Sequence, residues 1–392
     1  MFKIIGMTKL IWKLFKIVLT LLLAFLMYVV IGGVVPFLHH PDVSQTKKEA
    51  VESTQFYSDS AGPDRATIIE DNEEALKMRL RVIKDAKKTL ILSTFDFRSD
   101  DAGKDVLAAL LNAADRGVKV EIFADGFNSI IQMENNDYFY ALSSNKNIKI
   151  IIYNQVNILI PWNGLGRMHD KYVIADDSLY ILGGRNTFGY FLGDYAGHKN
   201  YDRDVLVYNT GSKDSSIYQI KDYYKKITSQ KCCSVFHYNE SLGEKNSVKK
   251  AEQELKNRYE SLENKYDKFL AENYDYKANT YETNKINLLS NPTSLYTKQP
   301  TVYYGLMYLA KNAKKEVKIH TPYIICNDYM YNELKNIKVP TTIMTNSAEN
   351  NGNIFGAVDY LNHKKDIINT GVTIKEYEGG ISYHGKSMTI DD

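Results

Sequence analysis

The sequence predicts an α/β fold made of two similar halves and preceded by one membrane-spanning helix. Three observations predict it: a long apolar run near the amino terminus, an alternation of strand-like and helix-like segments beyond it, and an internal repeat. The chain has 392 residues, which suffices for two or three domains or for one large bilobed one.

Composition narrows the classes of function. Hydrophobic residues make up 44% of the chain, enough for a sizeable core, and the formal net charge is +2. Dedicated nucleic-acid binders usually carry a basic surplus, so we expect no nucleic-acid partner. The three cysteines form no Cys-x-x-Cys pair, and no metal-ligand cluster is visible. We therefore expect neither a metal nor another cofactor.

The apolar run at residues 17–35 predicts a transmembrane anchor. It would extend roughly 28 Å as a helix, enough to span the hydrocarbon core of a bilayer. Lysines precede it, which by the positive-inside rule places residues 1–16 in the cytoplasm as a tail. We thus expect a single-pass protein of the cell membrane with an extracytoplasmic catalytic part. The alternative is a cleaved signal peptide, but the run is long for one and no Ala-x-Ala site follows.

Residues 36–62 are polar, end in Ser-Ala-Gly-Pro and predict a linker. Beyond it, residues 90–97 and 118–124 are β-branched apolar runs, and residues 105–115 between them have helical apolar spacing. This alternation is typical of α/β folds. We expect a first half at 63–240 and a second half at 281–392.

The two halves look like copies of one unit. Ala86-Lys87-Lys88 precedes a predicted strand at 89–94, and Ala313-Lys314-Lys315 precedes another at 316–321. Each strand is followed by a helical stretch, a further short strand and a His-x-Lys segment. Such self-similarity indicates a duplicated α/β unit.

Residues 241–280 separate the halves and predict a helical insertion. From 247 onward they are rich in Lys, Glu and Tyr with helical spacing. We interpret them as a solvated helix or helical hairpin, because the apolar seam is too irregular for a coiled-coil partner site.

A doubled pattern carries the chemistry. His169, Lys171 and Asp176 form His-x-Lys-(four residues)-Asp, followed by the run Gly183-Gly184-Arg185-Asn186. In the second half His384, Lys386 and Asp391 repeat the same spacing. One match is weak, but two matches, one in each repeat, are much more specific.

The sequence contains an internal control for this pattern. His363 and Lys365 also form His-x-Lys, but position 370 is Thr, so we interpret His363 as a surface residue. The remaining histidines lack the pattern.

The doubled pattern suits phosphodiester chemistry. Residues i and i+2 of an extended segment point to one face, so each His would project together with its Lys. A phosphodiester needs a nucleophile, an acid for the leaving alkoxide and positive charge for the equatorial oxygens. Two histidines can supply the first two, because imidazole titrates near neutrality. Two lysines and Asn186 can supply the third.

These residues resemble the two HKD motifs of the phospholipase D superfamily. The resemblance covers residues 63–392 apart from the helical insertion. Within the superfamily, Gly183-Gly184-Arg185-Asn186 followed by Tyr201-Asp202-Arg203-Asp204-Val205 is similar to bacterial cardiolipin synthases. The family has a further segment after its second motif, whereas this chain ends one residue after Asp391, so we expect a truncated second half.

The resemblance implies a mechanism through a phosphohistidine. His169 would attack phosphorus, and His384 would protonate the leaving alcohol and then deprotonate the acceptor. Lys171, Lys386 and Asn186 would hold the non-bridging oxygens.

Three carboxylates are candidates for supporting roles. Asp204 would accept a hydrogen bond from His169, or alternatively pair with Arg203 or Arg185. Asp176 and Asp391 would shape the motif rather than take part in the chemistry.

We therefore predict a membrane-anchored phosphodiesterase or phosphatidyltransferase. Its substrate would be a phospholipid such as phosphatidylglycerol, its acceptor water or an alcohol, and cardiolipin synthesis is one form of this reaction. A nuclease of the same superfamily is an alternative that the membrane anchor and the weak net charge oppose. A surface protein that kept the fold but lost activity is another, opposed by the intact His and Lys pairs.

Overall fold

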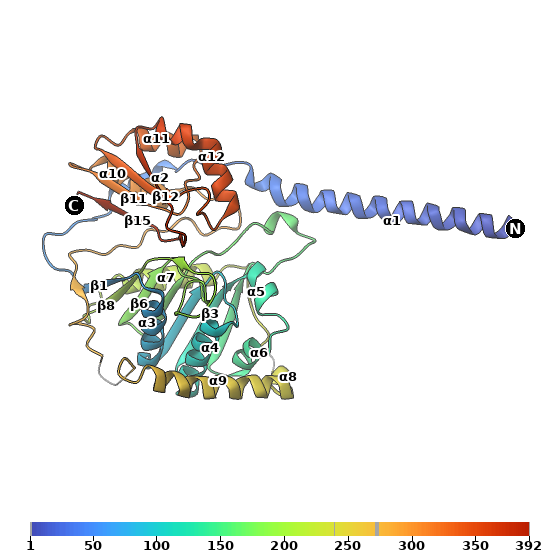
Figure 1. Cartoon of the computed structure of the whole chain (residues 1–392), viewed down its shortest axis with the longest axis horizontal. Helices are drawn as coiled ribbons and strands as arrows, with labels where there is room; N and C mark the ends of the chain where they lie inside the picture. The colour runs from blue at the N-terminus through green and yellow to red at the C-terminus, as the bar shows by residue number, and fades with distance from the viewer. Residues whose placement is uncertain (1, 239, 271–273, 392) are drawn as a thin grey trace.

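The computed structural model describes every residue except 1, 239, 271–273 and 392. Two α/β lobes form the body, and the helix α1 (Phe2–Val34) projects from it (Figure 1). The predicted α/β class is confirmed. The segment Lys9–Phe37 is long and apolar enough to cross a membrane, and no residue of its most apolar window is buried.

The first lobe is built on a nine-stranded sheet among the described residues, with the order β10-β1-β8-β6-β5-β2-β3-β4-β9. Strands β2, β3 and β4 are parallel to one another, whereas β5 pairs antiparallel with β2, β6 with β5, and β8 with β6. The bounds are β1 (Asp64–Ile69), β2 (Thr89–Thr94), β3 (Lys119–Asp125), β4 (Ile148–Tyr153), β5 (Tyr172–Ala175), β6 (Leu179–Gly183), β8 (Asp204–Asn209), β9 (Cys233–Val235) and β10 (Tyr281–Glu282).

Helices cover both faces of this sheet. One core packs under α3, α4 and α6, and a second lies under α7, where Ile217, Ile220 and Tyr224 are buried. Because both faces are covered, a central strand can be apolar and buried along its whole length, as β5 is. The bounds are α3 (Asn72–Asp85), α4 (Asp101–Asp115), α5 (Gly126–Gln132), α6 (Asp137–Ser144), the 3₁₀ turn η2 (Pro161–Asn163) and α7 (Ile217–Thr228).

The second lobe is a smaller copy of the same arrangement. Its sheet has the order β13-β12-β11-β15, with β11, β12 and β13 parallel and β15 antiparallel to β11. This order matches β4-β3-β2-β5 of the first lobe. The bounds are α10 (Thr301–Lys311), β11 (Val317–His320), α11 (Asp328–Lys335), β12 (Thr341–Asn346), α12 (Ile354–Ile368), β13 (Thr373–Tyr377) and β15 (Ser387–Ile390).

The repeat extends to the carboxylate that ends each motif. Asp176 accepts hydrogen bonds from three successive backbone N–H groups at 87–89, and Asp391 does the same at 314–316. Both residues have a positive φ, 53° and 59°. Aspartate tolerates this left-handed conformation better than most side chains. Each Asp thus ties the turn after its motif to the start of the neighbouring strand.

Two short strands join the lobes. β14 (Ser382–Tyr383) of the second lobe pairs in parallel with β7 (Asn200–Tyr201) of the first. The backbone N–H of His384 then donates to the Tyr201 carbonyl oxygen at 2.6 Å. This pairing carries the second His-x-Lys segment to the first lobe.

The helix predicted at 241–280 does form, but the prediction that it is a solvated insertion is wrong. A helix does form there, with α8 (Glu240–Gly243) and α9 (Asn246–Lys265), but α9 packs across the first lobe. Val248, Leu255 and Leu262 are buried in the main core. Their spacing is helical, so the apolar seam faces this chain rather than a partner.

The linker predicted at 36–62 and the boundary predicted at 281 also differ from the structure. After the short turn η1 (Val35–Phe37), α2 (Gln45–Glu52) buries Val51 beside Tyr304 of the second lobe. Strand β10, which begins at 281, pairs with β1 and so belongs to the first sheet. Short polar segments gave no sign of these long-range contacts.

Candidate active site

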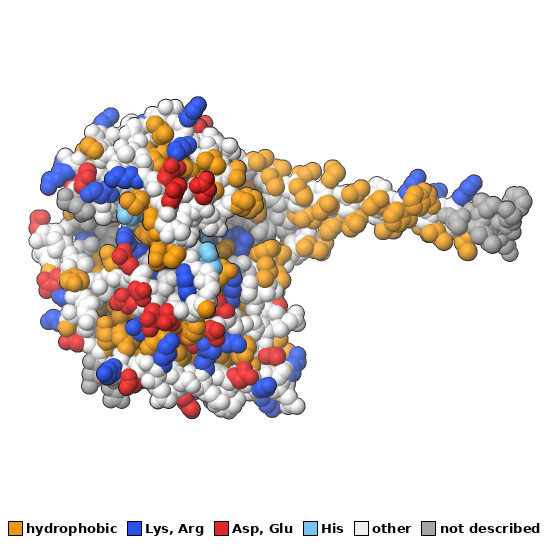
Figure 2. Space-filling model, viewed as in Figure 1, with side chains coloured by type: hydrophobic (Ala, Val, Ile, Leu, Met, Phe, Trp, Pro, Cys, Tyr) orange, Lys and Arg blue, Asp and Glu red, His pale blue; other side chains and the backbone are white. Residues whose placement is uncertain are grey.

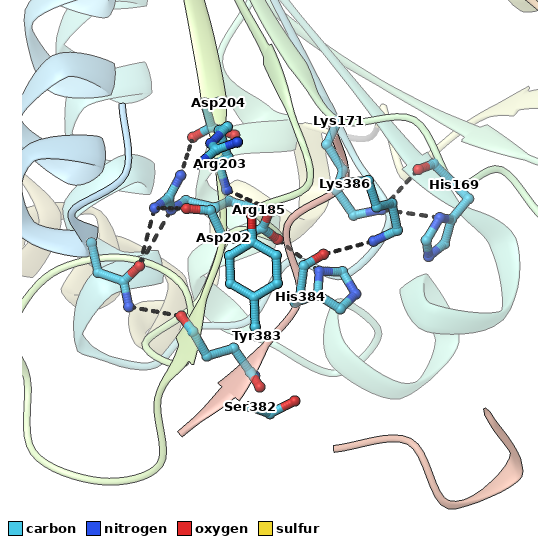
Figure 3. Close-up of polar contacts among 12 residues, drawn as sticks. His169, Lys171, Arg185, Asp202, Arg203, Asp204, Ser382, Tyr383, His384 and Lys386 are labelled. Atoms are coloured by element: carbon cyan, nitrogen blue, oxygen red, sulfur yellow. Dashed lines mark hydrogen bonds and ion pairs between the residues drawn. The ribbon is translucent and has the colours of Figure 1, made fainter. Parts of the chain in front are cut away.

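The His-x-Lys segments of the two lobes lie next to each other (Figure 3). His169 and Lys171 immediately precede β5, and His384 and Lys386 immediately precede β15, the equivalent strand. Figure 3 shows the two lysines side by side between the two histidines. The structure therefore brings the two predicted pairs together.

His384 is oriented by a carboxylate from the opposite lobe. Its Nδ1 lies 2.7 Å from Oδ2 of Asp202, which is buried. Burial lowers the pKa of the His384 imidazole, and the hydrogen bond to Asp202 opposes that shift. Burial raises the pKa of Asp202, but the hydrogen bond and charge of His384 outweigh it and leave the pKa below its usual value. The Nε2 of His384 is thereby left for proton transfer.

His169 has a different environment. Its ring meets that of Phe95 edge to face, with centroids 4.4 Å apart, and its Nδ1 lies 3.3 Å from Nζ of Lys171. Although the residue keeps contact with solvent in the cleft, desolvation and the charges of Lys171 and Lys386 lower the pKa of its imidazole. His169 is therefore unprotonated at neutral pH, as a nucleophile must be.

The two lysines sit in matching positions. Nζ of each donates to the carbonyl oxygen of the histidine two residues earlier, at 2.8 Å in both cases. Lys171 is buried, and burial together with the charge of Lys386 lowers its pKa to about 7. Desolvation also lowers the pKa of Lys386, although this side chain remains accessible to solvent and Asp202 opposes the shift. Two ammonium groups held this close favour an anion between them.

A buried arginine holds the segment that carries Asp202. Arg185 donates to the Asp202 carbonyl oxygen at 2.5 Å and to the Asp204 carboxylate at 3.1 Å, and Arg79 reaches the same carboxylate at 2.9 Å. A Cβ on Gly183 would lie 1.8 Å from Asp204 Oδ1, and one on Gly184 would lie 2.4 Å from Asp202 Oδ1. The two glycines are required because the two carboxylates pack directly against their backbone.

The hypothesis that Asp204 orients His169 is wrong. Asp204 pairs with Arg185 and Arg79, inside the lobe, which matches the alternative of an Arg185 partner. Arg203, the other suggested partner of Asp204, instead contacts Glu70 and the Ser387 hydroxyl.

Sequence reasoning missed Asp202, Phe95 and Arg167. Asp202 lies in a run already noted as motif-like, yet only the pairing of β14 with β7 distinguishes it from Asp204. Arg167 lies two residues before His169, and its guanidinium is stacked on Phe95 at 4.8 Å. No pattern in the sequence marks Phe95.

Asn186 is buried in the first lobe, next to Thr187, which is bridged to Phe97. Its Oδ1 has no hydrogen-bond partner among the described residues. The predicted role of Asn186 in holding phosphate oxygens stays a prediction. Asp176 and Asp391 lie on the backbone turns described above, at the far ends of β5 and β15 from the histidines.

A cavity of about 650 Å³ opens beside these groups. Basic side chains line it together with the carboxylate Asp170, which binds the Tyr223 hydroxyl at 2.6 Å. Its remaining wall is largely apolar and aromatic. The basic lining residues are Arg167, Lys171, Lys298 and Lys386. Such a site can hold a phosphate next to apolar groups. No group of three or more His, Cys, Asp or Glu side chains suited to a metal occurs within the described residues.

The two similar α/β lobes each supply a His-x-Lys pair, and His169, Lys171 and Lys386 of these pairs line one basic cavity. Comparison with known proteins agrees. A family model described as "Cardiolipin synthase, PLD-like domain" matches residues 80–227. The chain is 31% identical to cardiolipin synthase B of Salmonella typhi over 142 residues, which are 36% of this chain and 34% of the relative.

Two longer matches cover both lobes. An uncharacterized protein of Helicobacter pylori (strain ATCC 700392 / 26695) is 26% identical over 367 residues, 83% of this chain and 70% of the relative. The crystal structure of phosphatidylserine synthase from Haemophilus influenzae Rd KW20 has a TM-score of 0.56 at 14% identity, covering 88% of this chain and 80% of that one, which shows a shared fold. The sequence matches support membership of the phospholipase D superfamily.

Proposed function

We propose that this protein is a membrane-anchored phosphodiesterase or phosphatidyltransferase that acts on a phospholipid such as phosphatidylglycerol. The observation that carries the proposal is that two His-x-Lys pairs from different lobes lie together. His384 is hydrogen-bonded to the Asp202 carboxylate, whereas His169 lies beside Lys171. The similarity to lipid synthases of the superfamily supports the lipid substrate, and the apolar helix α1 supports the membrane location.

The reaction would proceed in two displacements at phosphorus. In the first, the unprotonated ring nitrogen of His169 forms a bond to phosphorus and the bond to the leaving oxygen breaks. His384 donates its Nε2 proton to that oxygen, so a neutral alcohol departs. In the second, His384 takes a proton from water or an acceptor alcohol, which attacks phosphorus and releases His169.

The neighbouring groups have defined tasks in this scheme. Asp202 stabilises the imidazolium of His384, as a buried carboxylate does when it accepts from Nδ1–H. Lys171 and Lys386 balance the negative charge on the non-bridging oxygens, and in a cavity of restricted solvent this effect exceeds its value in water. Asn186 is proposed as a further donor to these oxygens.

Product analysis with phosphatidylglycerol vesicles tests the proposal. The purified full chain should convert the lipid, and a His169→Ala variant should not. Cardiolipin with free glycerol, identified by mass spectrometry, would show transfer to an alcohol, whereas phosphatidic acid alone would show hydrolysis. No conversion of any phospholipid, with cleavage of a single-stranded oligonucleotide instead, would replace the proposal with the nuclease alternative.

Anion affinity should depend on pH through Lys171. Because the pKa of Lys171 is lowered to about 7, its positive charge is present below that pH and is lost above it. A non-cleavable phosphonate analogue of the lipid, whose own charge is constant in this range, should bind up to about tenfold more weakly per pH unit above 7. Isothermal titration at several pH values measures this.

Lys171→Arg is the matched variant, because guanidinium keeps its charge throughout the range. Its affinity should no longer fall as the pH rises through 7. An unchanged fall in Lys171→Arg would assign the effect to another group.

A further inference from the structure

Large apolar side chains are exposed on both lobes beside the root of α1. On the first lobe they lie on α5 and on the loop 157–165, and on the second lobe they lie on α12. In Figure 1, α5, the green loop and α12 all lie on the side of the body from which α1 projects. We call this surface the docking face; its exposed members include Phe127, Ile131, Ile158, Leu159, Phe355 and Val358.

On α12 the apolar residues occupy two opposite sides. Ala357, Tyr360 and Ile367 are buried in the second lobe. Phe355, which is 83% exposed, and Val358 point away from that core. An amphipathic surface helix normally turns polar residues outward, so this outward stripe needs a cover.

The loop of the docking face packs directly on α1. The Tyr28 hydroxyl donates to the Leu159 carbonyl oxygen at 3.1 Å, and the rings of Tyr28 and Trp162 meet edge to face at 6.1 Å. A Cβ on Gly32 would lie 2.7 Å from Cγ of Pro161. The loop and the end of α1 therefore form one packed unit.

These contacts set the depth of the loop relative to a bilayer. Lys16 is the last charged residue before the apolar run. At a rise of about 1.5 Å per residue, Tyr28 lies about 18 Å beyond Lys16, and a hydrocarbon core is about 30 Å thick. With Lys16 at one edge of the core, Tyr28 lies about 12 Å inside the other edge. The loop that contacts Tyr28 must then enter the hydrocarbon of the leaflet beyond the midplane from Lys16.

The docking face also connects to the catalytic groups. The Arg167 guanidinium is stacked on the rings of both Phe127 and Phe95, at 4.8 Å from each. Phe95 in turn contacts His169. A phosphate at the level of the headgroups would thus meet Arg167 and then His169, without leaving the surface layer.

We propose that α5, the loop 157–165 and α12 dock onto the bilayer that α1 enters, holding the cleft between the lobes at the level of the lipid headgroups. The occupant of the docking face is the lipid surface, since the face is continuous with the membrane-spanning helix. The inference rests on α1 spanning the membrane and not on the reaction proposed above.

Tryptophan quenching tests the depth of the loop. The chain has two tryptophans, so Trp12→Phe leaves Trp162 as the sole tryptophan, which is excited selectively at about 295 nm or above. The full chain, reconstituted in phosphatidylglycerol and phosphatidylcholine vesicles with brominated acyl chains, should lose Trp162 emission relative to unbrominated vesicles. Tyr281, which is 77% exposed on the β10 edge, provides the control: a Trp12→Phe/Trp162→Phe/Tyr281→Trp variant should retain its emission.

The second lobe is tested in the same way by Trp12→Phe/Trp162→Phe/Phe355→Trp. Losses of emission at positions 162 and 355, with none at 281, are the expected result. The proposal would be overturned if brominated and unbrominated vesicles gave equal emission at all three positions while the protein stayed in the membrane fraction after a carbonate wash. Cross-linking between copies of a Phe355→Cys variant, with no quenching in the Phe355→Trp variant, would also overturn it, because a second copy would then cover the face. Neither readout depends on catalysis, so both remain valid if no lipid is turned over.

Discussion

Replacing His169 with alanine should abolish phosphodiester cleavage, with a loss of at least about 10⁴-fold, the scale on which enzymes lose activity without their nucleophile. The physical reason is that His169 is unprotonated at neutral pH, whereas His384 is held to a carboxylate that favours its charged form. Rapid acid-free quenching of a ³²P-labelled substrate should trap a covalent adduct at His169 in the unaltered protein.

The reciprocal variant, His384→Ala, separates the nucleophile from the acid. It should cleave natural lipids about 10²- to 10⁴-fold more slowly, because an alkoxide leaves poorly without a proton. With a p-nitrophenyl phosphodiester, whose leaving group needs no proton, it should still release a burst of nitrophenol. A burst in His169→Ala and none in His384→Ala would reverse the two assignments.

Asp202→Asn should reduce turnover by roughly 10²- to 10⁴-fold while the protein stays folded. An amide cannot stabilise the His384 imidazolium, and it can favour the wrong tautomer by donating to Nδ1. The measurement is kcat on the lipid substrate, together with thermal unfolding to confirm that stability is retained. The p-nitrophenyl substrate should show a smaller loss, because the variant affects proton donation first.

Asp204→Asn is the matched control, two residues away in the same segment. Asp204 is buried between Arg79 and Arg185, so neutralising it leaves two buried guanidinium groups without their counter-ion. Breaking a buried ion pair typically costs about 3–5 kcal/mol. We expect a lower midpoint of thermal unfolding and a smaller effect on turnover per folded molecule than in Asp202→Asn. Lost turnover at unchanged stability would instead give Asp204 the catalytic role.

The elements with strong local patterns were predictable. The strand at 89–94 agrees with β2, and the helix expected at 105–115 is the later part of α4, which begins at Asp101. The prediction of a solvated insertion was wrong because Lys, Glu and Tyr dominate the composition of α9. Its buried residues, among them Leu255 and Leu262, are a minority of the helix. Polar composition indicates an exposed face but says nothing of what the opposite face covers.

The sequence by itself determined the duplicated His-x-Lys-Asp motif, the apolar helix and the α/β class, because these depend on residue type and spacing along the chain. Only the tertiary structure decided that Asp202, and not Asp204, binds His384, since that contact depends on the pairing of β14 with β7 across the two lobes. It likewise decided that the loop at 157–165 lies against α1. The physical reason is the same in both cases: hydrogen bonds and packing between segments far apart in the chain leave no periodic signal in either segment.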